Sequence, residues 1–481
     1  MRMPRAVLRL SSIALAAAML LTVTVLPPER VSSWIETWVG WEPVAEPPSP
    51  PPDPQAVAVA EGVSRERLYE HVRYLSTGPS RVTGYAGAQR AAEYIENQYR
   101  QLGLEDITVE GFTVPVPYDR GGRIELVSAE AASASIGFPL HALWPNHIRT
   151  PTLPEAGVSG RLIDGGGGRL EDLDGSPLEG SVVLLGFGSG TGYLRARMLG
   201  AAAIVFYDDG QVTRAEAAQK FLQVPVDIPR YWVDDLTARA LQTAAAQGVA
   251  RVRLSSRMDW IDAEAQSIYG WLRGDGEAMP MGQRQKEQVW GDQVILLHAY
   301  YDAISVVPAI APGAESATGI AAQLELARLL QQEGTRYTIL FVATPGHFQG
   351  LAGVNDFLYR YARVSDHFDE RMPAAQRLPF RLFLGLDLSS HSTAVGPFTM
   401  GTFYNSTWQT DDYQKNLMAH YAGRFKQYTR QTFGEVSRYQ DGIAPLKRTW
   451  KNYMPVRLTL DSEAAIFVGH EALTMVTPNQ L

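Results

Sequence analysis

The 481-residue chain contains no cysteine. This absence excludes disulfides, thiolate metal sites and cysteine nucleophiles together. The chain also has no excess of positive charge, since its net charge is -8 and its isoelectric point is near 5.7. Nucleic-acid-binding proteins usually carry a basic face, so we expect no nucleic-acid partner. A hydrophobic content of 45% and a charged content of 20% are ordinary for a globular protein, and the length suffices for two domains.

Long hydrophobic runs are scarce, and the one of interest lies at the N-terminus. Arg2, Arg5 and Arg9 precede an apolar run at 10–26. Positive charge before an apolar segment keeps the N-terminus in the cytoplasm and exports the chain beyond that segment. Because the small-residue triplets lie too early for cleavage, residues 1–27 favour an uncleaved signal anchor over a removed signal peptide. We therefore expect a membrane-anchored protein that faces the periplasm or the cell exterior.

The rest of the chain divides by composition. Residues 28–60 include the proline-rich stretch PVAEPPSPPPDP, which is typical of an extended stalk. Residues 61–127 and 271–481 alternate strand and helix patterns, which predicts a mostly parallel sheet with helices on both faces. Residues 128–270 differ in character and indicate an inserted domain. Its GGGG stretch precedes no helix with Lys or Ser/Thr, so it is not a phosphate-binding loop.

Polar side chains follow the predicted strands at the points where these end. The strand VILLHAYYDAIS contains Asp302, and the loop PGAESATG after it contains Glu315. The next strand, YTILFVAT, runs into a loop with His347, and FRLFLGLDLSS contains Asp387. Ligand sites in open α/β sheets lie at the carboxyl ends of the strands, so we expect these four side chains to share one edge.

This order of elements, with the loops PGAESATGIAAQLELAR and QGLAG and an early Arg-Val-Thr-Gly loop, resembles a known family. It is that of the secreted di-zinc leucyl aminopeptidases, which includes glutamate carboxypeptidase, the transferrin receptor and nicastrin. The resemblance implies a three-layer α/β aminopeptidase-like domain with a mostly parallel central sheet. Residues 128–270 resemble the β-rich protease-associated domain that is often inserted in this family, and an unrelated α/β insertion is the alternative.

The chain departs from the family at the residues that hold zinc. The family strand ends His-x-Asp, and the matching residues here are Tyr300 and Asp302. The family loop Gly-Glu-Glu supplies the general base and then a ligand, and His347 and Phe348 take these two places. Phenylalanine cannot coordinate, and tyrosine would ligate only as a phenolate. Glu463 most nearly replaces the last family ligand, a histidine. The resemblance therefore implies a degenerate site.

A cluster of carboxylates survives these replacements: Asp302, Glu315, Asp387 and Glu463. Oxygen-only ligands suit a weakly held Ca²⁺ or Mg²⁺ better than the family's Zn²⁺. The alternative is that each carboxylate has a local arginine or backbone donor. Among the histidines, His298 lies about 13 Å along its strand from Asp302, too far for a shared metal. His391 and His347 remain candidate ligands, and His470 is a poor substitute.

Two functions are compatible with this pattern. The first is a pseudoenzyme, a membrane-tethered homologue without conventional peptidase activity that binds a peptide or protein partner, as the transferrin receptor and nicastrin do. The alternative is an active zinc-type aminopeptidase, a hydrolase whose rebuilt metal site uses Asp302, Glu315, His347 and Asp387.

Overall fold

The structure is a computed structural model, and the residues that it describes are 54–127, 136–247, 251–276, 278–279, 288–289, 294–362, 378, 380–390, 394–398, 401, 421, 423–427 and 459–477. The predicted anchor at 10–26, the stalk before residue 54 and His391 lie outside these residues. None of the described helices is long and apolar enough to cross a membrane.

Helices open the described part of the chain. Ser64 caps the second of them, because its Oγ accepts the Arg67 backbone N–H at 3.3 Å. Gly103 follows the third with a φ of +75°, a conformation that glycine adopts without strain. The three helices are α3 (Pro54–Glu61), α4 (Arg65–Ser76) and α5 (Ala86–Gln101).

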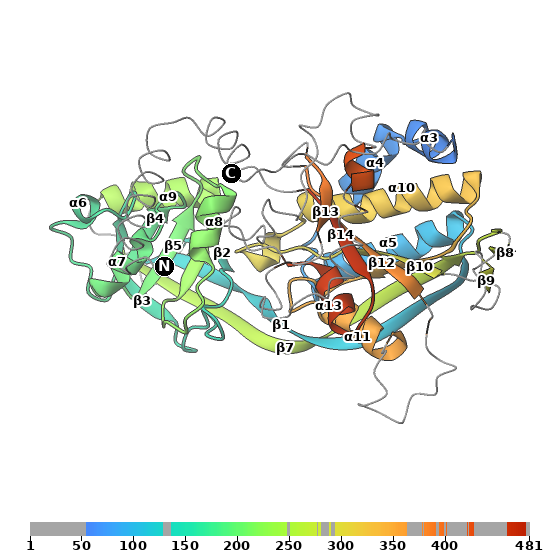
Figure 1. Ribbon diagram of the computed structural model, residues 1–481. Coiled ribbons are helices and arrows are strands. Elements are labelled where there is room, and N and C mark those ends of the chain that lie inside the picture. Colours follow the sequence, from blue (N-terminus) through green and yellow to red (C-terminus); the bar gives the residue numbers. More distant parts are fainter. Residues whose placement is uncertain are drawn as a thin grey trace, which may run out of the picture. The chain divides into compact units, whose positions relative to one another are not determined.

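A parallel group of strands forms the centre of the aminopeptidase-like part (Figure 1). Its order is β11 (Thr338–Thr344), β10 (Val294–Tyr300), β12 (Phe380–Asp387) and β14 (Ala472–Val476). Two antiparallel strands flank this group, β7 (Arg251–Leu272) beside β11 and β13 (Gly396–Phe398) beside β14. The expected mixed α/β fold with a large, mostly parallel sheet is confirmed.

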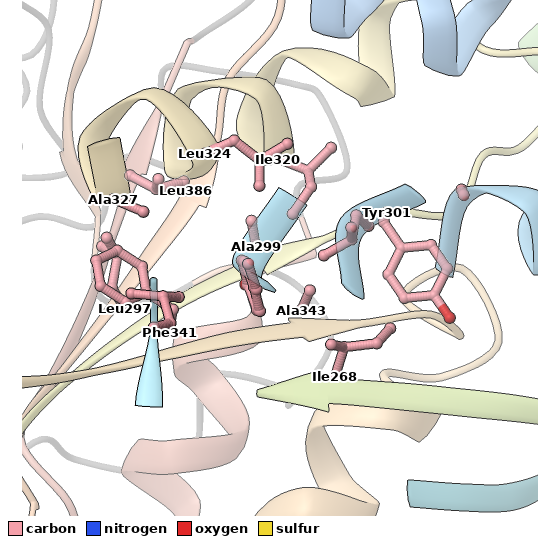
Figure 2. Close-up of a cluster of buried hydrophobic side chains, with 14 of the residues drawn as sticks. Ile268, Leu297, Ala299, Tyr301, Ile320, Leu324, Ala327, Phe341, Ala343 and Leu386 are labelled. Carbon is pink, nitrogen blue, oxygen red and sulfur yellow. The ribbon is translucent and has the colours of Figure 1, made fainter. Parts of the chain in front are cut away.

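Helices cover both faces of this sheet because the side chains of its strands alternate between faces. Leu297 and Ala299 of β10 pack with α4, α5 and α10 (Thr318–Glu333), and Figure 2 shows part of this cluster, including Leu324. Leu296 faces the other way and packs with α11 (Ala352–Tyr361) and α13 (Asp461–Phe467). The three layers expected from the sequence are therefore present.

The inserted region combines five strands with parts of β1 (Glu105–Val127) and β7. The pairing order β1-β2-β6-β5-β4-β3-β7 returns to β1 and so closes a ring, which leaves no free sheet edge within it. The strands are β2 (Ile136–Ala142), β3 (Val158–Asp164), β4 (Val182–Gly186), β5 (Ala203–Tyr207) and β6 (Arg230–Trp232), and the helices are α6 (Leu170–Leu173), α7 (Gly192–Met198), α8 (Arg214–Lys220) and α9 (Asp235–Ala246).

Strands β1 and β7 are long and pair along almost their whole length, from Glu105 opposite Trp271 to Val127 opposite Arg251. They therefore belong both to the inserted ring and to the aminopeptidase-like part. The predicted boundary at residue 270 falls inside β7, and the division into 61–127, 128–270 and 271–481 stays a prediction. A separate two-stranded sheet joins β8 (Ala278–Met279) and β9 (Gln288–Val289).

Candidate functional site

The parallel strands β10, β11 and β12 bring the predicted residues to one edge of the sheet. Tyr300 ends β10, Asp302 follows two residues later, and Asp387 ends β12. His347 lies in the loop after β11, three residues beyond Thr344. The carboxyl ends of parallel strands lie at the same edge of a sheet, so residues at or just after these ends come together.

Asp302 is fully buried and accepts hydrogen bonds from three donors. The Thr83 hydroxyl donates to Oδ2 at 2.9 Å, the Gly346 N–H donates to the same oxygen at 3.1 Å, and the His347 N–H donates to Oδ1 at 3.4 Å. Burial raises the pKa of Asp302 to about 6, although the His347 charge and these donors oppose the rise. Thr83 belongs to the Arg-Val-Thr-Gly loop, so that loop supports the strand end directly.

His347 forms a buried ion pair with Asp461, the first residue of α13. Their Nδ1 and Oδ2 atoms are 3.0 Å apart, and both side chains are 4% exposed. Burial alone would lower the pKa of His347, but the charges of Asp461, Asp387 and Asp302 raise it to about 9. The same contact overcomes burial at Asp461 and lowers the pKa of that carboxyl group. At neutral pH the pair is therefore an imidazolium beside a carboxylate.

His298 lies on the other side of Asp461. Its Nδ1 is 3.8 Å from the same Asp461 oxygen, and its Nε2 is 2.8 Å from the Thr344 hydroxyl. Burial lowers the pKa of His298 to about 4, so this imidazole is neutral where His347 is charged. Two buried histidines in different protonation states thus share one aspartate.

Two aromatic rings, those of Tyr300 and Phe348, pack against His347 of this pair. Tyr300 stacks on His347 with ring centroids 3.9 Å apart, and Phe348 meets both rings edge-on, at 5.6 Å from Tyr300 and 4.7 Å from His347. The Tyr300 hydroxyl donates to Asp387 Oδ1 at 2.7 Å. Burial and the Asp387 charge raise the pKa of the Tyr300 phenol well above its usual range. Tyr300 is therefore a neutral hydrogen-bond donor.

Glu463 and Glu315, the other two carboxylates predicted for the cluster, both lie at the start of a short helix, and their place in the cluster stays a prediction. The carboxylate that reaches His347 from α13 is that of Asp461, while Glu463 Oε2 accepts the Leu460 N–H at 3.1 Å at the start of the same helix. Glu315 begins a short 3₁₀ helix, Glu315–Ala317, and another 3₁₀ helix, Pro308–Ile310, precedes it in the chain. Within the described residues, no group of three His, Asp or Glu side chains is arranged to hold a metal ion.

The loop before Glu315 is held by a buried arginine. Arg81 donates from Nη2 to the Gly313 carbonyl at 2.5 Å and to the Ser316 hydroxyl at 2.9 Å. Burial lowers the pKa of Arg81 to about 10, and the Asp302 charge opposes this. Arg81 therefore places a positive charge near Asp302. His470, in contrast, stacks on Phe380 at 3.9 Å and bonds to the Ala362 carbonyl.

Sequence reasoning missed Asp461 and the part played by His298. Asp461 stands two residues before the predicted Glu463, in the segment matched to the last family ligand. In the structure Asp461 is the first residue of α13 and contacts His347, which precedes it by 114 residues. The sequence pattern did not indicate this contact.

Comparison with known proteins agrees with this fold. The model of peptidase family M28 matches residues 281–442. The peptidase M28 precursor from Shewanella amazonensis SB2B is 14% identical over 87% of each chain, with a TM-score of 0.50. BSAP, a zinc aminopeptidase from Bacillus subtilis, is 18% identical over 85% of this chain and 84% of its own, with a TM-score of 0.48. The aminopeptidase from Aneurinibacillus sp. strain AM-1 is 16% identical over 87% and 86%, with a TM-score of 0.43.

Identities this low speak for the fold alone, and the family model matches only the middle part of the chain, residues 281–442. The matched residues contain strands β10, β11 and β12 and the loops of the site. The described part of the chain therefore has an aminopeptidase-like α/β fold, and residues 281–442 are similar to the peptidases of family M28.

Proposed function

We propose that this protein is a membrane-tethered, extracytoplasmic pseudoenzyme of the M28 type that binds a peptide or protein partner without conventional peptidase activity. The observation that carries the proposal is that donors of the chain contact each of the three site aspartates, Asp302, Asp387 and Asp461, although Asp461 Oδ1 has no hydrogen-bond partner among the described residues. Thr83, Gly346 and His347 donate to Asp302, Tyr300 donates to Asp387, and His347 pairs with Asp461.

Zinc, the metal of the resembled family, does not fit these residues. A catalytic zinc needs three nitrogen or oxygen ligands in their deprotonated forms. His347 contacts Asp461 through Nδ1, so only its Nε2 remains to coordinate a metal. The Tyr300 phenol keeps its proton, and Phe348 has no donor atom. Of these three side chains, only His347 can therefore offer a ligand, which is fewer than the three that a catalytic zinc requires.

The packing of the site supports the same conclusion. A metal between the strand ends would have to separate Tyr300 from His347, whose rings are stacked at 3.9 Å. These positions instead form a packed cluster of rings beside the His347–Asp461 ion pair.

Binding is the role that remains for such a domain outside the cytoplasm. The charge asymmetry around residues 10–26 and the proline-rich stretch after it support tethering through a stalk. The resemblance to a protease-associated domain at 128–270 supports a two-part ectodomain. The transferrin receptor and nicastrin show that this family accommodates members that bind rather than hydrolyse.

The first test is metal content and turnover of the purified protein. We expect less than one tightly bound zinc per chain by elemental analysis and no hydrolysis of aminoacyl-arylamides. A triple variant, Tyr300→His, His347→Glu and Phe348→Glu, should gain zinc affinity and serves as the positive control. Stoichiometric zinc in the unmodified chain, with turnover abolished by Asp387→Ala, would establish the rebuilt metallopeptidase instead.

The same samples test the hard-ion alternative. Titration with Ca²⁺ or Mg²⁺ should show no saturable site that depends on Asp302 and Asp387, because both carboxylates already have donors. Saturable binding lost in Asp302→Asn would show that the carboxylates hold a cation.

The second test is topology. Protease added to intact spheroplasts should remove the domain that follows the stalk, since residues 43–481 are proposed to lie outside the cytoplasm. Full protection of that domain, with cleavage only after lysis, would refute the extracytoplasmic placement.

A further inference from the structure

The inserted region contains a hollow of about 450 Å³ on its surface, away from the strand-end site. Leu173 and Leu178 lie in its lining and are buried, at 2% and 5% exposure. Both belong to the apolar cluster that also holds Phe187, so the floor is anchored in the core. A hollow with a fixed floor is preformed, which lowers the ordering cost of binding.

Large apolar side chains are exposed on part of the rim of this hollow, and the rest of the rim is lined by polar groups. Leu170 is 66% exposed and Leu199 is 48% exposed, and the neighbouring Met198 is 85% exposed. Single exposed apolar residues are normal on a protein surface, but large ones gathered around a hollow are typical of a binding surface. Each of these side chains would lose water contact if a partner side chain entered the hollow.

The segment that lines one side of the hollow is acidic, and Arg169 lies next to it in the chain. The segment 171–179 reads EDLDGSPLE and holds four carboxylates but no lysine or arginine, and the lining includes Glu171 and Asp174. Glu171 pairs with Arg169 at 3.0 Å, and within the described residues Asp174 has no ion pair. Arg197 of α7 donates hydrogen bonds to the backbone carbonyls of Asp227 and Ala201.

We propose that this hollow binds a cationic peptide segment of a protein partner, with a leucine-sized side chain in the hollow and flanking lysines or arginines against Glu171 and Asp174. Nucleic acids and anionic lipid surfaces are repelled by the same carboxylates. The exposed ion pairs contribute little affinity and mainly fix orientation, while the buried apolar side chain contributes most. Binding at this hollow does not depend on whether the strand-end site holds a metal.

The test uses three fluorescein-labelled hexapeptides and polarisation on the full chain. The probe Gly-Lys-Leu-Lys-Leu-Lys should bind saturably. Gly-Lys-Ser-Lys-Ser-Lys, of equal charge, should bind at least about tenfold more weakly because it lacks apolar side chains. Gly-Glu-Leu-Glu-Leu-Glu should not bind.

Variants locate the site. Leu199→Ser should weaken binding of the Lys-Leu probe about tenfold, and the pair Glu171→Gln with Asp174→Asn should weaken it and reduce its salt dependence. The matched control is Leu236→Ser in α9, where the leucine is 76% exposed but lies outside the lining of the hollow. Because all these positions are exposed, the variants should fold.

Absence of saturable binding by the Lys-Leu probe, equal binding of the serine peptide, or unchanged affinity in Leu199→Ser would each overturn the proposal. None of these results bears on zinc content or turnover, so a failure here is distinguishable from a failure of the proposed function.

Discussion

The ion pair between His347 and Asp461 should dominate the pH dependence of stability near neutrality. The pKa of His347 rises from 6.5 to about 9 on folding, which corresponds to about 3 kcal/mol. A raised folded-state pKa means that this contribution is fully present below pH 6.5 and is lost as the pH rises to about 9. We therefore expect the unfolding free energy to fall by up to about 3 kcal/mol across this window.

Neighbouring groups titrate outside the window, which makes the measurement specific. The pKa of Asp302 rises from 3.8 to about 6, so its effect, a loss of stability with rising pH, ends before that of His347 begins. Burial lowers the pKa values of His71, His298 and His470 below 6.5, and they too titrate at lower pH.

Substitutions separate the pair from its surroundings. His347→Gln leaves Asp461 buried without a counter-charge and should cost about 3–5 kcal/mol at pH 6.5, as should Asp461→Asn for the opposite reason. The double variant replaces the ion pair with two neutral amides, so its cost should be well below the sum of the single costs. Both single variants and the double variant should lack the slope between pH 6.5 and 9.

The assay is urea denaturation followed by circular dichroism at pH 6, 7, 8 and 9. His470→Gln is the matched control, because it removes a part-buried histidine that pairs with a carbonyl rather than a carboxylate, and it should retain the slope. Additive costs in the double variant, or an unchanged slope in His347→Gln, would refute the reasoning.

Three further changes have expected outcomes. Tyr300→Phe removes the hydroxyl donor of Asp387 and should lower the unfolding free energy by about 1–3 kcal/mol, measured by denaturation. Lys220→Met removes a fully buried ammonium that bonds to a carbonyl and a glutamate and should lower the unfolding free energy by about 1–3 kcal/mol in the same assay, because the Phe187 carbonyl is left unpaired. The fragment 128–270 should fail to unfold cooperatively while 105–272 does so, because the shorter one leaves β7 without β1; equal cooperativity would contradict this.

Local sequence determined the frame of this protein. Alternating apolar residues on β10, such as Leu296 and Leu297, specify two faces of a strand whatever the rest of the chain does. Because parallel strands end at one edge, the positions of Asp302 and Asp387 followed from the order of strands alone. That Tyr300 and Phe348 are poor metal ligands likewise follows from the chemistry of their side chains alone.

Tertiary structure alone decided which side chains meet. Two residues along an α-helix are about 200° apart around its axis, so a small offset in the start of α13 exchanges Asp461 for Glu463 at the site. From the sequence, only the distance of His298 from Asp302 along the same strand could be stated. Its partner Asp461 lies 163 residues later in the chain, on another element. Only the packing of α13 on the sheet could bring the two histidines to one aspartate, because contacts between distant segments depend on how layers pack and not on local pattern.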